Sequence, residues 1–351
     1  MSSPLDACGP PSSSSAAGMR QGVSVGAERA STLNTVSVSV LVPAYESADT
    51  LPRLLKSLAA TEAVDFECVV VDDGSKDDTG KVCREFAKGR WLELRYERQR
   101  HGGKARAVNR GAGLCRGELV FIVDADDALP RQGLRRLWEA WQGISGEKRE
   151  AFAGVEGHAV DMATGEIIGS PYPRSLFDSD HLYTRYKLGI KGDKKRAIRR
   201  DVLLNHVFPE VEGEDFVPMS WLWDRVGARY MFRYIDTTVY LKEYRECGIT
   251  ASRPAITIRN PQGCLLYYQR ALGLIGRDGR LNWWRCLRIA ANVVRYSLHA
   301  SRAPRDELWG GKEYSVLLVA VPVGVVRWMA DLLILGMCRA GRKHPRQAWS
   351  G

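Results

Sequence analysis

Short apolar runs rich in β-branched residues alternate with helix-length amphipathic stretches from residue 36 to residue 127. This alternation is typical of βαβ units that build a parallel sheet. We expect strands at residues 36–43, 66–71, 92–96 and 119–123, and helices at 49–60, 77–88 and 104–115. The first third of the chain therefore predicts an α/β fold.

The pattern is weaker beyond this region. Residues 130–142 favour a helix, residues 151–162 one or two strands, and residues 228–244 a pair of strands. Few features indicate any element between residues 163 and 205. From Asn260 onward the spacing of apolar residues predicts helices.

Composition narrows the class of protein. The chain has 351 residues, and its 45% apolar content is enough for a sizeable core, which excludes fibrous and wholly disordered proteins. The eight cysteines include no CxxC pair, which suits a reducing cytosol. Residues 1–35 are rich in Ser, Pro, Gly and Ala and lack the basic and apolar segments of a signal peptide, so we expect a disordered tail.

Most of the net charge of +10 lies in the C-terminal half. A basic surface suits nucleic acid, an anionic membrane or a phosphate-bearing substrate. Because no recognised nucleic-acid-binding motif accompanies these bases, we expect no nucleic-acid partner and keep a nucleic-acid-binding protein as the alternative class. We interpret the six bases of residues 191–200 first as a solvated face or as partners of the acids in 210–215, and second as a site for an anionic acceptor.

Two clusters of carboxylates follow predicted strands directly. Asp72-Asp73-Gly74 follows the second strand, and Asp124-Ala125-Asp126-Asp127 follows the fourth. Ligands bind at this edge of open α/β sheets. Two carboxylates spaced by one residue can share a hard cation that bridges to a diphosphate. The alternative is that the first cluster forms a turn and the second caps a helix.

Four segments follow one another along the chain: residues 38–46 (VSVLVPAYE), 69–75 (VVVDDGS), 103–111 (GKARAVNRG) and 121–127 (FIVDADD). Taken in this order, they resemble the nucleotide-sugar half of the inverting glycosyltransferases of family 2. A fifth, residues 212–215 (EGED) followed by 238–245 and 248–250, resembles the acceptor-side pattern of that family. The resemblance covers about residues 36–255.

The resemblance implies a GT-A fold, a mostly parallel Rossmann-like sheet flanked by helices. It places a nucleotide-sugar half at residues 36–130 and an acceptor half at 150–255, and we expect residues 256–351 to form a helical, membrane-associating extension with a basic tail. The implied reaction is a non-processive, inverting transfer from a nucleotide-diphosphate sugar to a saccharide or lipid-linked acceptor in cell-surface or exopolysaccharide synthesis. UDP is the commonest donor base in that family, and the implied cofactor is Mn²⁺ or Mg²⁺.

Residue roles follow from the same resemblance. Asp124 would lie near the ribose and the metal, Asp126 would ligate the metal, and Asp127 would serve either role. Asp215 would be the general base, with Glu214 beside it as a second candidate. Further implied donor-binding residues are Pro43, Ala44 and Tyr45 in the base pocket, with Glu46 beside them, Asp73 as the hydrogen-bond acceptor of the base and Asp72 as another contact, and Lys104 and Asn109 near the ribose and diphosphate.

Two related enzyme classes fit less well. Processive polysaccharide synthases carry a QxxRW motif, but Arg327-Trp328 has no Gln three positions before it. Sugar nucleotidyltransferases, the second alternative, carry a GxGTR loop after the first strand, where this chain has Pro43-Ala-Tyr-Glu46.

The C-terminal region suggests contact with a membrane. Residues 281–298 form a basic amphipathic pattern with Arg285, Arg288, Asn292 and Arg295 on one stripe. The apolar run 316–326 is too short to span a bilayer, and Asp331 stands one turn after Arg327, its expected ion-pair partner. We predict attachment to the inner face of the plasma membrane, with residues 315–338 either lying on the surface or inserting as a hairpin.

Overall fold

The computed structural model describes residues 36–62, 64–244, 249–276, 283–303 and 314–340. The chain divides into two units, Met1–Asn34 and Thr35–Gly351. The first unit, with the predicted disordered tail, lies outside the described residues. All that follows concerns the second unit.

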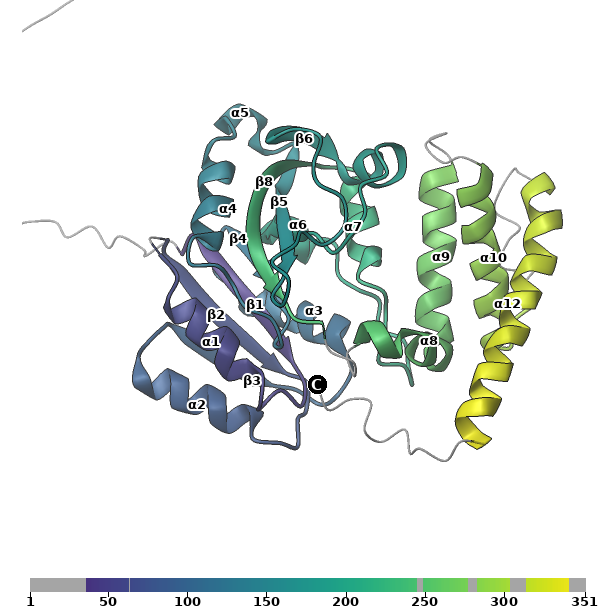
Figure 1. Cartoon of the computed structure of the whole chain (residues 1–351), viewed down its shortest axis with the longest axis horizontal. Helices are drawn as coiled ribbons and strands as arrows, with labels where there is room; N and C mark the ends of the chain where they lie inside the picture. The colour runs from purple at the N-terminus through teal and green to yellow at the C-terminus, as the bar shows by residue number, and fades with distance from the viewer. Residues whose placement is uncertain (1–35, 63, 245–248, 277–282, 304–313, 341–351) are drawn as a thin grey trace, which may run out of the picture. The chain divides into compact units, whose positions relative to one another are not determined.

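One eight-stranded mixed sheet organises this unit (Figure 1), with the strand order β3-β2-β1-β4-β7-β5-β8-β6. Strands β1 to β4 are mutually parallel, β7 runs antiparallel to β4 and β5, β8 pairs parallel with β5, and β6 pairs antiparallel with β8. The strands are β1 Val38–Ala44, β2 Phe66–Asp72, β3 Leu94–Arg98, β4 Leu119–Ile122, β5 Phe152–Asp161, β6 Leu176–Asp180, β7 Lys195–Arg199 and β8 Met231–Lys242.

Helices cover both faces of the sheet because its strands are apolar on both sides. Val40 and Val42 of β1 pack into one cluster with α1 Leu51–Ala59, α2 Thr79–Gly89 and α4 Gly133–Gln142. Leu41 points to the opposite face and packs with α3 Lys104–Leu114, α6 Arg200–Leu204 and α7 Ser220–Gly227. Short helical turns occur at α5 Gly146–Arg149 and at η1 Tyr183–Lys187, which is π-helical.

Four helices follow the sheet: α8 Ile249–Arg259, α9 Pro261–Gly276, α10 Trp283–His299 and α12 Tyr314–Ala340. Helix α10 packs against both α9 and α12 (Figure 1). Their shared core contains Leu265 of α9, Val293 and Val294 of α10, and Ala320 of α12. Gly324 of α12 lies so close to Ala291 and Val294 that a Cβ there would overlap them.

The parallel part of the sheet confirms the predicted strands and helices to within a few residues. The predicted strand pair at 228–244 is wrong, because these residues form one long strand, β8. Residues 151–162 form the single strand β5, and helical structure begins at Ile249 instead of Asn260. The weakly patterned stretch 163–205 contains β6, η1, β7 and α6.

Our first interpretation of the basic run 191–200 is also wrong. Its residues 195–199 form strand β7, inside the sheet, where Arg196 is buried, and Lys194 directly before the strand is buried too. Arg196 forms an ion pair with Glu156, its neighbour across the β5–β7 register. The acids of residues 210–215 are not the partners of these buried bases, and no solvated basic face exists at β7.

The predicted helix at 281–298 is confirmed as α10, but its polar stripe is not solvated as a whole. Asn292 is buried, and Arg295 donates to Asp331 of α12 at 2.6 Å. His299 lies 2.9 Å from the same carboxylate, so the expected Arg327–Asp331 pair is replaced by contacts from α10. The apolar run 316–326 lies within one continuous helix, α12. Among the described residues, no helix combines the length and apolar character needed to cross a bilayer.

Candidate active site

The carboxyl ends of β1, β2 and β4 meet at one edge of the sheet. Ala44 of β1 lies opposite Asp72 of β2, and the Asp73 amide donates to the Ala44 carbonyl at 2.8 Å. Strand β4 flanks β1 on its other side, so Asp124 follows at the same edge. The parallel pairing therefore gathers both predicted carboxylate clusters, as expected for such a sheet.

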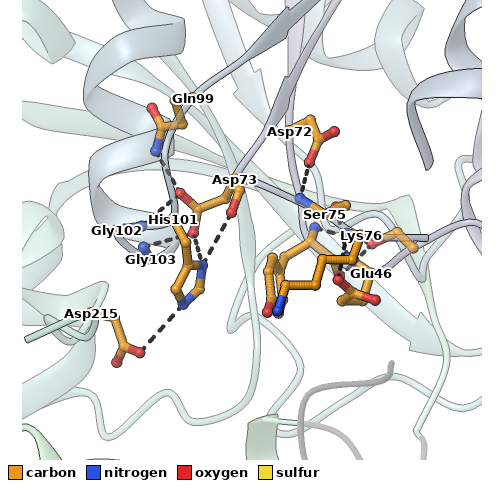
Figure 2. A network of polar contacts seen from close by, with 12 residues as sticks. Glu46, Asp72, Asp73, Ser75, Lys76, Gln99, His101, Gly102, Gly103 and Asp215 are labelled. Atoms are coloured by element: carbon orange, nitrogen blue, oxygen red, sulfur yellow. Dashed lines mark hydrogen bonds and ion pairs between the residues drawn. The ribbon is translucent and has the colours of Figure 1, made fainter. Parts of the chain in front are cut away.

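The Asp73 carboxylate organises the loop that precedes α3 (Figure 2). Its Oδ1 accepts hydrogen bonds from Gln99 Nε2 at 2.6 Å and from the Gly102 amide at 3.0 Å, and its Oδ2 accepts one from the Gly103 amide at 2.7 Å. His101 Nδ1 lies 2.9 Å from Oδ2. With only 4% of its side chain exposed, this carboxylate fixes the loop from within the protein.

His101 connects this loop to Asp215. Its Nε2 lies 3.5 Å from Asp215 Oδ2, on the ring edge opposite the Asp73 contact (Figure 2). The imidazole also packs against the Tyr45 ring, with 4.4 Å between ring centroids. Three predicted site residues from separate motifs therefore surround one histidine.

Asp215 is held by the segment that opens α9. Its backbone amide donates to Asn260 Oδ1 at 2.8 Å. Both Glu214 oxygens accept from backbone amides of α9, Gln262 at 2.8 Å and Gly263 at 2.7 Å. Glu214 therefore caps the helix, and this contact orients the neighbouring Asp215.

Gly103 makes the approach of α3 to Asp215 possible. Its φ of +87° lies in the left-handed region, and a Cβ at this position would overlap the Asp215 carbonyl oxygen. Only glycine fits both requirements. Lys104, the next residue, forms an ion pair with Asp124. Residues 103 and 104 thus join the general-base candidate to the second carboxylate cluster.

Asp124 is surrounded by cations. Besides Lys104, Lys195 of β7 reaches it at 3.2 Å, and Lys195 also lies over the Tyr240 ring. Burial by itself would raise the pKa of Asp124, but Lys104 and Lys195 hold it well below the ordinary carboxyl range. The Asp124 backbone amide donates to Tyr240 Oη at 2.9 Å. Asp124 is therefore an ionised, oriented carboxylate.

Asp126 and Asp127 differ in their surroundings. Asp127 is fully buried and accepts from Tyr240 Oη at 2.7 Å and from the Glu243 amide at 2.8 Å. Burial and the charge of Asp124 raise its pKa to about 6. The Asp126 side chain is partly exposed, and burial and the Asp124 charge raise its pKa. No described side chain donates to the Asp126 carboxylate.

These differences decide which carboxylate fits a divalent cation. Within the described ranges, no three His, Cys, Asp or Glu side chains are arranged as a metal site. Asp126 fits a cation nevertheless, because its partly exposed carboxylate has no side-chain donor among the described residues and the neighbouring Asp124 charge raises its pKa. A hard cation is commonly held by one or two carboxylates and completed by substrate phosphates. Asp127 is enclosed by protein donors, and Asp124 is already paired with two lysines.

Three other predicted residues make contacts within the protein. The Asp72 carboxylate accepts from the Ser75 amide at 2.8 Å and from Tyr96 Oη at 2.6 Å. The Glu46 carboxylate accepts from the Lys76 amide at 2.7 Å (Figure 2). The Asn109 amide group exchanges two 2.9 Å hydrogen bonds with the Phe208 backbone. Pro43 and Ala44 close β1 at the same edge.

Sequence reasoning missed several residues at this edge: His101, Lys195, Tyr240, Lys242 and Asp193. Lys242 Nζ lies 3.0 Å from Asp193 and 3.8 Å from Asp127. Lys195 and Asp193 stand in the stretch with little recognisable pattern, and Tyr240 and Lys242 end a strand that we divided in two. His101 precedes the Gly102-Gly103 pair, which was the one feature that marked its position.

The arrangement of the sheet and its polar edge defines the GT-A fold. The chain is similar to the crystal structure of S. aureus TarS residues 1–349 in complex with UDP-GlcNAc, with a TM-score of 0.53 and 19% identity over 81% of this chain and 79% of that chain. The UDP complex of the same protein aligns with a TM-score of 0.51 and 16% identity over 88% and 93% of the two chains. At this identity the likeness concerns the fold.

Sequence comparison supplies the family. Residues 39–204 match the family Glycosyl transferase family 2. It is 39% identical to the succinoglycan biosynthesis protein ExoO of Rhizobium meliloti over 29% of each chain. It is 30% identical to the glycosyltransferase GlyG of Streptococcus pneumoniae over 30% of this chain and 35% of that protein. The matched segment spans about a third of the length of these relatives.

Proposed function

We propose that this chain transfers a sugar from a nucleotide-diphosphate sugar, UDP-linked in the first instance, to a saccharide or lipid-linked acceptor, with inversion and with help from Mn²⁺ or Mg²⁺. The observation that carries this proposal is the Gly103–Lys104 junction. Gly103 touches Asp215, while Lys104 pairs with Asp124, two residues from Asp126. Two adjacent residues thus connect the candidate general base, Asp215, with the carboxylate cluster that contains the candidate ligand of the cation, Asp126.

Inverting transfer needs both groups. The acceptor oxygen attacks the anomeric carbon as the bond to the diphosphate oxygen breaks, so a base must take the acceptor proton and positive charge must stabilise the leaving group. Asp215 is the base in this proposal. Asp126 would hold the cation, with Lys104 as a fixed positive charge nearby. A divalent cation, when bound, supplies Lewis-acid stabilisation of the leaving diphosphate.

The relatives support the substrate class. TarS was solved with UDP-GlcNAc, which favours a UDP-sugar as the donor. ExoO is named for succinoglycan biosynthesis, and this favours a saccharide acceptor in exopolysaccharide synthesis. Because the matched segment covers only part of ExoO, the proposal concerns a class of donors and a class of acceptors.

The test is release of nucleotide diphosphate from a panel of nucleotide sugars with Mn²⁺ and with EDTA. Asp126→Asn should remove most turnover and metal-dependent donor binding. Asp215→Asn should lower transfer by ~10²–10⁴-fold and keep nucleotide affinity. Asp65→Asn, an exposed aspartate just before β2 at the opposite end of the sheet, is the matched control and should retain full activity. No turnover with any donor would refute the function.

We also propose that the outer face of α12 attaches the enzyme to the inner membrane surface. Val326 and Leu333 are 59% and 69% exposed and lie two turns apart on the same face of the helix. Val319, Val323 and Met329 extend this exposed apolar face. Trp284 of α10 is 71% exposed. Exposed apolar helix faces with Trp residues and nearby bases are typical of interfacial binding.

Co-sedimentation of the full chain with anionic vesicles tests this attachment. The double change Val326→Asp and Leu333→Asp should abolish sedimentation without loss of donor hydrolysis. Val207→Asp, at a 50% exposed valine after α6, is the control and should sediment as the unsubstituted chain does. If the unsubstituted chain stays in the supernatant at low salt, the attachment is refuted.

A further inference from the structure

The tautomer of His101 is determined by its surroundings. Nδ1 faces two acceptors of the same residue, Asp73 Oδ2 at 2.9 Å and the Asp73 carbonyl oxygen at 3.1 Å. A carbonyl oxygen cannot donate, and both oxygens of the Asp73 carboxylate already accept from Gln99 and from the Gly102 and Gly103 amides. A neutral His101 therefore carries its proton on Nδ1, and its Nε2 presents a lone pair.

That lone pair faces Asp215. Nε2 lies 3.5 Å from Asp215 Oδ2, and two groups without a proton between them would repel at this position. The contact is attractive when one proton lies between the carboxylate and the imidazole. Catalytic hydrogen bonds of this kind are commonly long before substrate binds and shorten in the complex. The geometry thus contains a place for one additional proton.

We propose that His101 is a positioning residue that orients Asp215 and receives from it the proton of the acceptor hydroxyl. This inference rests on the proposed function, because the proton that His101 receives is the one released by the acceptor hydroxyl during sugar transfer. Asp73 holds the ring through Nδ1–H, so the Asp73–His101–Asp215 chain links the donor-side loop to the base (Figure 2).

The step balances. The acceptor O–H bond breaks and a bond forms between the acceptor oxygen and the anomeric carbon, while the bond from that carbon to the diphosphate oxygen breaks and the diphosphate leaves with the electron pair. The proton passes through Asp215 Oδ2 to His101 Nε2, giving an imidazolium between two carboxylates. Exchange with water then returns His101 to its neutral form.

The two flanking carboxylates make this proton transfer favourable. Titratable groups in contact with His101 include Asp73, Asp215 and Tyr45. Two anions stabilise the imidazolium electrostatically, while the Tyr45 ring holds its plane from the side. A proton held on Asp215 alone would leave that base unable to act again until it was released to water.

Kinetics of His101→Gln and His101→Ala test the role. Gln keeps a polar side chain but cannot accept a proton, so we expect kcat for transfer to fall by ~10²-fold with the donor KM and UDP affinity unchanged. The pH profile of kcat should lose the ionisation that His101 contributes. Added imidazole should restore part of the rate of His101→Ala and none of the rate of Asp215→Asn.

Two outcomes would overturn the inference. One is a kcat for His101→Gln within about threefold of the unsubstituted enzyme, because general acid–base help typically contributes ~10²-fold or more. The other is loss of UDP affinity in both variants without rescue by imidazole, which would make His101 a purely structural residue.

Nitrogen NMR of His101 in the unsubstituted full chain separates this inference from the function. We expect a proton on Nδ1 and a changed titration of His101 in Asp215→Asn. A proton on Nε2 would refute the relay even if the enzyme transfers sugar. Absence of transfer with a confirmed Nδ1–H tautomer would instead refute the proposed function.

Discussion

The two halves of the sheet differ in the kinds of side chains that their strands bury. Strands β1, β2 and β4 consist mostly of apolar residues and pack between helices on both faces, with Glu67 and Asp72 of β2 as their buried charged residues. Strands β5 and β7 carry Glu156 and Arg196 into the interior, and Lys194, directly before β7, is buried as well. The donor half is therefore held mainly by apolar packing, and the acceptor half depends in addition on a buried network of charged and polar side chains.

This network is continuous. Glu156 pairs with Arg196 and accepts from Tyr172 Oη at 2.7 Å, and Arg196 lies 3.0 Å from His181 Nδ1. His181 Nε2 is 3.6 Å from Asp224 of α7. Because buried charges cost several kcal/mol unless they are paired, each member depends on its neighbour. A charged residue in the sequence therefore indicates an exposed position only if the fold offers it no buried partner of opposite charge.

The largest effect should follow from breaking this network at its centre. Arg196→Met leaves Glu156, which is 2% exposed, without its cation, and we expect the free energy of unfolding to fall by ~3–5 kcal/mol. Adding Glu156→Leu should recover most of the loss. Urea unfolding measures both, with Arg131→Ala at an exposed ion pair as a control that should change stability by less than ~1 kcal/mol. A double variant no better than the single would contradict the pairing.

A core substitution in the donor half should have a smaller effect of a different kind. Val70→Ala in β2 removes two fully buried carbon atoms, and we expect a loss of about 2 kcal/mol from transfer and cavity terms. No second substitution should rescue it, and its effect should add to that of Arg196→Met within about 0.5 kcal/mol. Strong non-additivity in urea unfolding would show that the two halves are energetically coupled.

Lys195 of β7 reaches across to Asp124 at the end of β4, so it connects the halves at the site. Lys195→Met makes the site more negative, and we expect metal-free UDP affinity to fall about tenfold, ~1.4 kcal/mol, while Mn²⁺ enhances binding more than before. Calorimetric titration with EDTA and with Mn²⁺ measures both terms. Unchanged metal-free affinity would exclude Lys195 from the electrostatics of the donor site.

The smallest effect concerns pH. Burial and the nearby Lys194 lower the pKa of His158 from its ordinary value of 6.5. The unfolded chain then binds a proton near that pH while the folded chain does not, so stability falls as the pH drops below about 6.5. His158→Gln should reduce this loss by less than about 1 kcal/mol per pH unit. Equal acid sensitivity of both proteins would exclude His158 as a source.

Sequence patterns located the donor half well because its strands are continuous apolar runs followed by Asp72-Asp73 and Asp124 to Asp127. They failed from residue 163 to 244, where buried charges interrupt the apolar runs of β7 and a single twelve-residue strand, β8, resembles two shorter ones. Periodicity detects a strand by its apolar face, so a strand that buries an ion pair has no such signature.

Local patterns were enough to predict the α/β class, the order of the strand motifs and the resemblance to a glycosyltransferase family, because these depend on periodicity and on residues close together in the chain. The role of each carboxylate became clear only in the folded chain. Asp73 holds a loop and Glu214 caps α9, since their donors come from segments distant in sequence, while no described side chain donates to the Asp126 carboxylate. His101 gained its place between Asp73 and Asp215 for the same reason: hydrogen bonds are short, and only folding brings their two ends together.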